Sequence, residues 1–346
     1  MRAILVDAPR GVPTPATVPD PDHPPHGAVV RVRATGVCRS DWHAWVGHDG
    51  TIRWPHVPGH EFAGEVVAVG GEVRGEWLGA RVTAPFCCGC GACGTCRQGH
   101  THLCEHEFQP GFDGWGSFAE YVTVPWADVN LSRLPEGLGF DEAASLGCRF
   151  MTSFHGLIDR AALRPGETVA VFGCGGVGLA AVAIAAAAGA CVVAVDLVPE
   201  KLALARELGA SLVVDASRED PVPAIAEATD GGADVTVDAL GGRVTSAQGI
   251  RALRPRGRHL QLGLLLGDDA DPRVPLQRVV RHELAVFGGH GMPASSYPRL
   301  FRFIERGRVP LARLIGERRP LDEAGAALAA MERFVPVGVT LLHPGS

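Results

Sequence analysis

The stretch that decides the fold reads Val169-Ala170-Val171-Phe172-Gly173-Cys174-Gly175-Gly176-Val177-Gly178. Its four apolar residues predict a buried strand, and the glycines predict a tight turn into an apolar helix. In such a turn Gly173 permits the bend, Gly175 lets the backbone approach a pyrophosphate, and Gly178 allows close helix packing. We therefore predict a dinucleotide-binding unit, with Gly176 and Val177 at the phosphate-binding helix start.

Strand-like and helix-like segments alternate on both sides of this turn. They are residues 168–172, 177–188, 191–195, 200–208, 211–214, 234–238 and 258–263. The alternation predicts a doubly wound parallel sheet, and we place this Rossmann domain at residues 150–289. Asp196 ends the second strand, where a carboxylate accepts ribose hydroxyls and repels a 2′-phosphate, so NAD is favoured over NADP. Lys201 is either a further ribose contact or a solvated helix lysine.

The residues before 150 have a different composition and pattern. Short β-branched runs, such as 27–34 and 65–69, lie among many prolines and glycines. This pattern predicts a twisted antiparallel barrel of short strands over residues 1–149. After Gly289-His290-Gly291 come an amphipathic segment at 297–307 and a short tail. We expect residues 290–346 to return to the first domain.

Four cysteines form a metal-type cluster inside the first domain. Two residues separate Cys90 from Cys93 and Cys93 from Cys96, and seven residues separate Cys96 from Cys104. This spacing is typical of a closed tetrahedral zinc site, in which four sulfurs leave no position for substrate. The predicted role is structural, and the alternative is a redox-labile thiol cluster.

A second set of metal-type residues, Cys38, His60 and Cys148, is left over for chemistry. Each residue alone is more often a packing residue than a ligand. Together they provide two thiolates and an imidazole, which would leave the fourth position of a zinc ion free for a substrate.

Composition excludes several classes of function. The chain has 346 residues, of which 46% are hydrophobic and 20% charged, with a formal net charge of -6. No Lys/Arg-rich run occurs, so nucleic-acid binding is disfavoured. The N-terminus lacks the apolar core of a signal peptide, and the longest apolar stretch, 177–188, is too short to span a bilayer. We therefore expect a cytoplasmic protein.

The chain resembles the zinc-dependent medium-chain alcohol dehydrogenases over essentially its whole length. The resemblance rests on the cysteine spacing, on Ala143-Ala144-Ser145-Leu146-Gly147-Cys148, and on Gly59-His60-Glu61-Phe62-Ala63-Gly64 with Gly70 and Val73 at later intervals. It implies an α/β chain with a GroES-like twisted β-barrel catalytic domain and a Rossmann cofactor domain. It also implies that Cys38, His60 and Cys148 hold a catalytic zinc.

The resemblance assigns roles to residues beside these ligands. Asp41 would orient His60, and Glu61 would approach the metal during ligand exchange. Arg39 corresponds to a pyrophosphate contact. Ser40 and His43 correspond to a proton relay between substrate and solvent. In a competing interpretation, Ser40 and Asp41 only cap the helix that follows Cys38.

The implied reaction is the reversible oxidation of a primary or secondary alcohol by hydride transfer to NAD, with two zinc ions per chain. Two alternatives stay open: a reductase of an imine or conjugated alkene, and a catalytically silent NAD- or zinc-binding protein. Trp54, Phe86 and Trp115 predict an aromatic-lined pocket for a bulky apolar or aromatic alcohol, unless they are core or subunit contacts. By analogy with the family, a homotetramer is favoured over a dimer.

Overall fold

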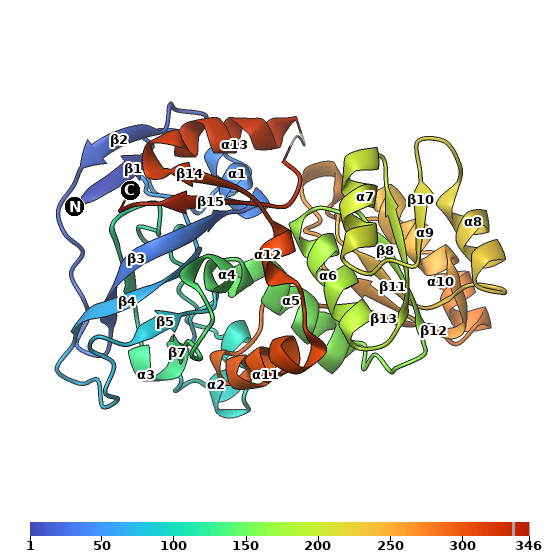
Figure 1. Ribbon diagram of the computed structural model, residues 1–346, viewed down its shortest axis with the longest axis horizontal. Coiled ribbons are helices and arrows are strands. Elements are labelled where there is room, and N and C mark those ends of the chain that lie inside the picture. The colour runs from blue at the N-terminus through green and yellow to red at the C-terminus, as the bar shows by residue number, and fades with distance from the viewer. Residues whose placement is uncertain (334–335, 346) are drawn as a thin grey trace. The chain divides into compact units, whose positions relative to one another are not determined.

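The computed structural model describes residues 1–333 and 336–345, which form two compact units (Figure 1). The first unit holds Met1–Met151, Gly291–Arg302 and the described residues from Ile315 onward, and the second holds Thr152–His290 and Phe303–Leu314. Part of the predicted return segment therefore groups with the second unit, where Phe303 packs on Phe154 with ring centroids 5.2 Å apart. The boundaries that we drew between folding domains stay a prediction.

A seven-stranded, largely antiparallel sheet forms the frame of the first unit. Its path runs β14-β15-β3-β4-β5-β7, and β6 pairs with β3. The bounds are β3 (Ala28–Val37), β4 (Glu61–Val69), β5 (Arg81–Thr83), β6 (Tyr121–Val124), β7 (Ser132–Arg133), β14 (Ile315–Pro320) and β15 (Val339–His343), while β1 (Arg2–Leu5) pairs separately with β2 (Thr14–Thr17).

The register of β3 and β4 prepares the candidate site. Gly36 of β3 lies opposite Glu61 of β4. Cys38 follows the end of β3 and His60 precedes the start of β4, so antiparallel pairing brings these two residues together. Residues that are 22 positions apart in the sequence thereby become neighbours because of one strand pair.

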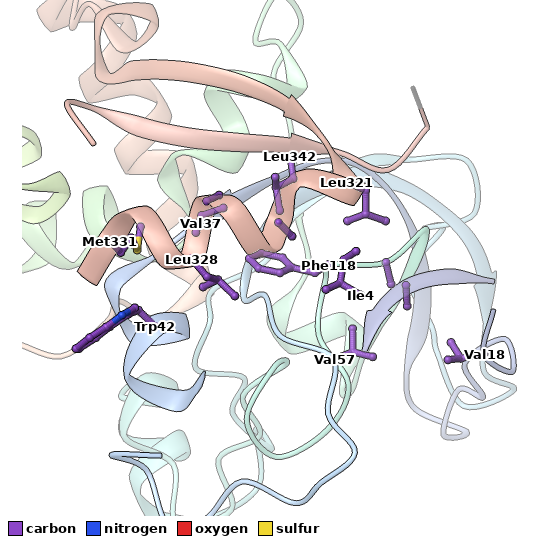
Figure 2. Close-up of a cluster of buried hydrophobic side chains, with 14 of the residues drawn as sticks. Ile4, Val18, Val37, Trp42, Val57, Phe118, Leu321, Leu328, Met331 and Leu342 are labelled. Atoms are coloured by element: carbon purple, nitrogen blue, oxygen red, sulfur yellow. The ribbon is translucent and has the colours of Figure 1, made fainter. Parts of the chain in front are cut away.

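Short helices complete the first unit. They include α1 (Arg39–Trp45), α2 (Gly94–Arg97), α3 (Ala127–Asn130), α4 (Phe140–Ala144) and α13 (Ala324–Glu332). Two helices are divided between the units: α5 (Met151–Phe154) has only its first residue here, and α11 (Tyr297–Gly307) belongs here up to Arg302. Figure 2 shows a core cluster in which Leu328 of α13 lies against Phe118, with Ile4 and Leu342 close by. This apolar cluster also contains Trp42 and so fixes one face of α1.

The second unit is built on a six-stranded sheet whose pairs are all parallel, in the order β10-β9-β8-β11-β12-β13. The strands are β8 (Thr168–Phe172), β9 (Cys191–Asp196), β10 (Leu212–Asp215), β11 (Ala233–Asp238), β12 (Leu253–Gln261) and β13 (Ala285–Gly288). The helices are α6 (Gly176–Ala187), α7 (Pro199–Glu207), α8 (Pro221–Ala228), α9 (Arg243–Arg251), α10 (Leu276–Arg281) and α12 (Leu311–Leu314).

This strand order confirms the predicted doubly wound fold. The chain starts at β8 in the middle, winds to β10 on one side and then to β13 on the other. Dinucleotides bind where such an order reverses, at the carboxyl ends of the central strands. The glycine turn that begins at Gly173 follows β8 directly and therefore lies at this place.

Some elements of the second unit were not among the predicted segments, namely β13 and helices α8, α9, α10 and α12. The amphipathic segment at 297–307 forms α11, as its pattern predicts. Within the described residues, none of the helices has the length and apolar character that a bilayer crossing needs.

Candidate active site

The cysteine cluster (Cys90, Cys93, Cys96 and Cys104) has the geometry of a tetrahedral metal site. All four sulfurs lie within 4.8 Å of one another. The Sγ atoms of Cys90 and Cys96 are 4.0 Å apart, and those of Cys93 and Cys104 are 3.8 Å apart. Four Zn–S bonds of about 2.3 Å would place the sulfurs about 3.8 Å from each other. The donor set therefore fits a zinc ion.

Backbone N–H groups turn towards the sulfurs of this cluster. The Cys96 N–H donates to Cys93 Sγ at 3.4 Å, and this contact is the leading cause that lowers the pKa of Cys93 to about 6. The His106 N–H donates to Cys104 Sγ at 3.2 Å. Such donors stabilise thiolates, which are the form that binds metal.

The Cys/His cluster (Cys38, His60, Glu61 and Cys148) brings the second predicted ligand set together. One ligand atom of each residue lies within 4.8 Å of the others. The His60 Nδ1 atom contacts Asp41 Oδ1 at 2.9 Å, whereas its Nε2 atom is buried and has no hydrogen-bond partner among the described residues. A buried nitrogen without a partner is costly unless a ligand completes it. The atom therefore fits a metal ligand.

Neighbouring groups shift the pKa values of Cys38 and His60. A hydrogen bond with Cys148 is the leading cause that holds the pKa of Cys38 well below its usual value, against the effect of burial. Burial acts to lower the pKa of His60, but the Asp41 carboxylate and the Cys38 sulfur outweigh it and raise that pKa. The Cys38 thiolate is thus stabilised, and a thiolate is the form of cysteine that binds zinc.

Asp41 combines the two roles that the sequence left as alternatives. It lies in the first turn of α1, and its Oδ2 atom accepts a hydrogen bond of 2.8 Å from the Cys38 N–H at the helix start. Its Oδ1 atom contacts His60 and also accepts from the Gly59 N–H at 3.1 Å. A carboxylate behind a ligating histidine fixes the tautomer and the direction of the ring.

Sequence reasoning missed a buried ion pair beside the ligands. Arg149 Nε donates to Glu61 Oε1 at 2.9 Å, and Arg149 Nη2 donates to the other carboxylate oxygen. Arg149 Nη1 also donates to the Val37 carbonyl at 3.1 Å. Burial raises the pKa of Glu61 to about 7, against the opposing effect of Arg149. The one signal for this ion pair in the sequence was the position of Arg149, which directly follows Cys148 inside an apolar run.

The remaining predicted residues of α1 have separate environments. The Cys38 Sγ atom lies 3.8 Å from Ser40 Oγ. His43 contacts His48, with the two Nδ1 atoms 2.9 Å apart. The Arg39 guanidinium stacks 3.7 Å from the centroid of the Trp42 ring and donates to the Met331 carbonyl.

The aromatic residues predicted for the pocket divide into different settings. Phe86 packs edge-on to His60, with ring centroids 6.1 Å apart. Trp54 meets the His56 ring at 5.8 Å, and Trp115 packs against the core cluster of Figure 2. Phe112 contacts His60 at 5.5 Å, although sequence reasoning did not name it.

The glycine turn of the second unit fits a dinucleotide. Gly173 has a φ of +91, and a Cβ atom on Gly178 would lie 1.7 Å from the Gly173 carbonyl oxygen. A Cβ atom on Gly175 would meet nothing within 4 Å, so this backbone is open to approach. The turn ends at Gly176 and Val177, the first residues of α6, where helix N–H groups favour an anion.

Asp196 closes the other side of this turn. Its Oδ2 atom accepts from the Cys174 N–H at 2.6 Å, and its Oδ1 atom accepts from the Leu197 N–H at 2.8 Å. Lys201 is only 7% exposed, so it is a buried residue and not a solvated helix lysine.

The fold and the two clusters together define the class of medium-chain dehydrogenases, with a barrel-type unit and a dinucleotide-binding unit. The model of the alcohol dehydrogenase GroES-like domain matches residues 24–136, and that of the zinc-binding dehydrogenases matches residues 176–306. The chain belongs to the zinc-dependent medium-chain alcohol dehydrogenase family of oxidoreductases.

Individual relatives resemble almost the whole chain. An alcohol dehydrogenase from Geobacillus stearothermophilus is 34% identical over 88% of each chain. An NAD-dependent alcohol dehydrogenase from Sulfurisphaera tokodaii is 33% identical over 94% of this chain and 95% of its own length. The structure of the alcohol dehydrogenase TADH from Thermus sp. ATN1 covers 99% of both chains with a TM-score of 0.91 and 32% identity.

Proposed function

We propose that this chain is a zinc- and NAD-dependent alcohol dehydrogenase that interconverts an alcohol and its aldehyde or ketone. The observation that carries the proposal is the environment of the two ring nitrogens of His60. Its Nε2 atom is buried beside Cys38 and Cys148 and has no hydrogen-bond partner in the described part of the chain, while Asp41 holds its other nitrogen. Three ligands and an open fourth position are the arrangement of a catalytic zinc site.

The chemistry divides between bound groups and side chains. When bound, zinc supplies Lewis acidity towards the substrate oxygen, and NAD accepts a hydride. We assign to Ser40 the hydroxyl that exchanges a proton with the substrate, and to His43 the base that carries this proton on. Burial, followed by the charges of Arg39 and His48, lowers the pKa of His43 to about 4. At neutral pH the ring is therefore uncharged and able to accept a proton.

Arg149 balances the charge of the site. A zinc ion would neutralise the two thiolates, and Arg149 pairs with the Glu61 carboxylate. The two-pronged contact of Arg149 holds Glu61 in a fixed place. Any approach of Glu61 to the metal during ligand exchange then requires that this contact breaks.

The coenzyme assignment rests on the turn after β8. Gly173, Gly175 and Gly178 shape the pyrophosphate site, and Asp196 favours the unphosphorylated ribose of NAD over NADP. We keep Lys201 as a ribose contact and Arg39 as a pyrophosphate contact. Four sulfurs at the cysteine cluster support a second, structural zinc ion, which gives two per chain.

Two phenylalanine rings pack edge-on against the His60 ring, and this apolar surrounding supports an apolar substrate. Phe86 and Phe112 both meet the His60 ring, so we infer a bulky apolar or aromatic alcohol and keep Trp54 and Trp115 as further pocket candidates. A cytoplasmic homotetramer stays part of this proposal.

The experiment is a substrate panel on protein of known zinc content. NADH formation is followed with aliphatic, benzylic, allylic and polyol alcohols, with NADP in parallel. We expect turnover with NAD and two zinc ions per chain. Zinc at the cysteine cluster alone, without turnover, would instead support the silent protein. Turnover of an imine or alkene after removal of the catalytic zinc would support the reductase.

A further inference from the structure

The C-terminal end of α1 folds two histidines onto each other. The Gly47 N–H donates to the Ala44 carbonyl at 3.0 Å, and the His48 N–H donates to the His43 carbonyl at 3.0 Å. Gly47 has a φ of +83. This pattern is a Schellman motif, in which the residue after the glycine comes to lie over the third residue from the helix end. An apolar pair usually occupies these two positions, but here both residues are histidines.

The contact between the two rings has the geometry of a hydrogen bond. The Nδ1 atoms of His43 and His48 are 2.9 Å apart, and the ring centroids are 5.2 Å apart. Two lone pairs at this distance would repel, so one ring carries the Nδ1 proton and the other accepts it. His43 is half-buried and His48 is exposed. The hydrogen bond between the two rings therefore joins a half-buried histidine to an exposed one.

Trp42 supports both rings at once. Its ring meets His43 edge-on with centroids 5.0 Å apart and His48 edge-on at 5.5 Å. The Arg39 guanidinium stacks on the same indole. Trp42 is buried in the core cluster of Figure 2, so the support is anchored to the fold.

We propose that His48 is the outer member of the proton relay, taking the proton from His43 and releasing it to water. The inference rests on the proposed function, because alcohol oxidation must dispose of one proton per hydride transferred. A proton enters at His43 Nε2, the His43 Nδ1 proton moves to His48 Nδ1, and the His48 Nε2 proton leaves to water. One proton enters and one leaves, and exchange with water between turnovers restores the starting tautomers.

The charges around His43 agree with this direction. Burial lowers the pKa of His43, and the positive charge of Arg39 lowers it further, whereas Cys38 opposes them. From α13, the Glu332 carboxylate acts on Arg39. A proton is therefore unstable on His43 at neutral pH and needs a nearby acceptor, which the exposed His48 ring provides.

The test compares the wild type with His48→Gln in alcohol oxidation at low buffer concentration over a range of pH. We expect His48→Gln to lower kcat about tenfold, as for the partial loss of a general base, with added imidazole restoring the rate. The matched control is His23→Gln, which removes another exposed histidine of the same unit and should leave the rate and its pH profile unchanged. Equal rates and pH profiles for His48→Gln and the wild type would overturn the relay.

A second readout separates the relay from folding and from the function itself. Histidine nitrogen NMR of the protein without substrate should show the Nδ1 proton shared between His43 and His48, and His48→Gln should abolish this signal while the melting temperature is kept. Two separate, unlinked rings in the wild type would overturn the relay even in an active enzyme. A wild type without dehydrogenase activity would overturn the proposed function, and the relay with it.

Discussion

At the scale of single residues, Asp41 is the group whose loss should be most informative. Its carboxylate holds both the start of α1 and the His60 ring. Asp41→Asn keeps the size of the side chain but removes the charge that orients His60. We expect zinc affinity at the Cys/His cluster to fall about 10- to 100-fold. Competition with a chelator measures this, and retention of the structural zinc is the control. Unchanged affinity at both sites would contradict the role of Asp41.

Arg149 and Glu61 offer a second test at this scale. Arg149→Met leaves the buried Glu61 carboxylate without its partner, and the expected loss in the free energy of unfolding is about 3–5 kcal/mol. The double variant Glu61→Gln, Arg149→Met removes both charges and should recover part of that loss. Denaturant unfolding measures both. A single variant as stable as the wild type would show that the pair is not important for the fold.

Residues could be predicted from the sequence where the chemistry is local. The spacing of Cys90, Cys93 and Cys96 brings three sulfurs together without knowledge of the fold, and the structure shows them converging. Arg149 lies 88 positions from Glu61, so that no local pattern joins them. Phe112 was missed for the same reason, because only the loop path brings it to His60.

At the scale of elements, the glycine turn can be tested with a matched pair of substitutions. Gly178→Ala would place a Cβ atom 1.7 Å from the Gly173 carbonyl oxygen, so we expect loss of stability and of NAD binding together. Gly175→Ala meets nothing within 4 Å, so we expect a normal melting temperature but weaker NAD binding. Coenzyme titration by fluorescence and thermal unfolding separate the two effects. Tight NAD binding by Gly175→Ala would contradict the assigned pyrophosphate site.

The loop between β4 and β5 depends on one carboxylate from α3. Asp128 accepts hydrogen bonds from the Arg74 N–H at 2.8 Å, the Gly75 N–H at 2.9 Å and Trp77 Nε1 at 2.7 Å. Burial acts to raise the pKa of Asp128, but these hydrogen bonds outweigh it and lower that pKa. A lowered carboxyl pKa gives stability that is complete above the unfolded value and lost as the pH falls through the folded one.

We therefore expect Asp128→Asn to lower the melting temperature at pH 7 by about 2 °C. The difference from the wild type should begin to shrink as the pH falls below about 4, where the Asp128 carboxyl of the unfolded chain takes up its proton. It should vanish below the lowered pKa of the folded chain. Thermal unfolding at a series of pH values checks this. A difference that persists unchanged at acidic pH would contradict the electrostatic explanation.

At the scale of the whole molecule, alternation in the sequence was enough to predict the parallel sheet but not all of its members. The central strand β8 has four buried residues in its five, which gives a strong signal. β13 alternates between half-buried and exposed residues, and α10 has none that is buried, so neither produces a recognisable apolar period. Residues 303–314 were assigned by position in the chain, whereas packing groups them with the second unit.

The central claim is that Cys38, His60 and Cys148 hold a catalytic zinc that alcohol oxidation requires. The most direct test measures zinc content and NADH formation for the wild type and Cys38→Ser on the same preparations. The account predicts two zinc ions and turnover for the wild type. For Cys38→Ser it predicts one zinc ion, an unchanged circular dichroism spectrum and no turnover. A Cys38→Ser protein that keeps both zinc ions, or that still oxidises the alcohol, would contradict it.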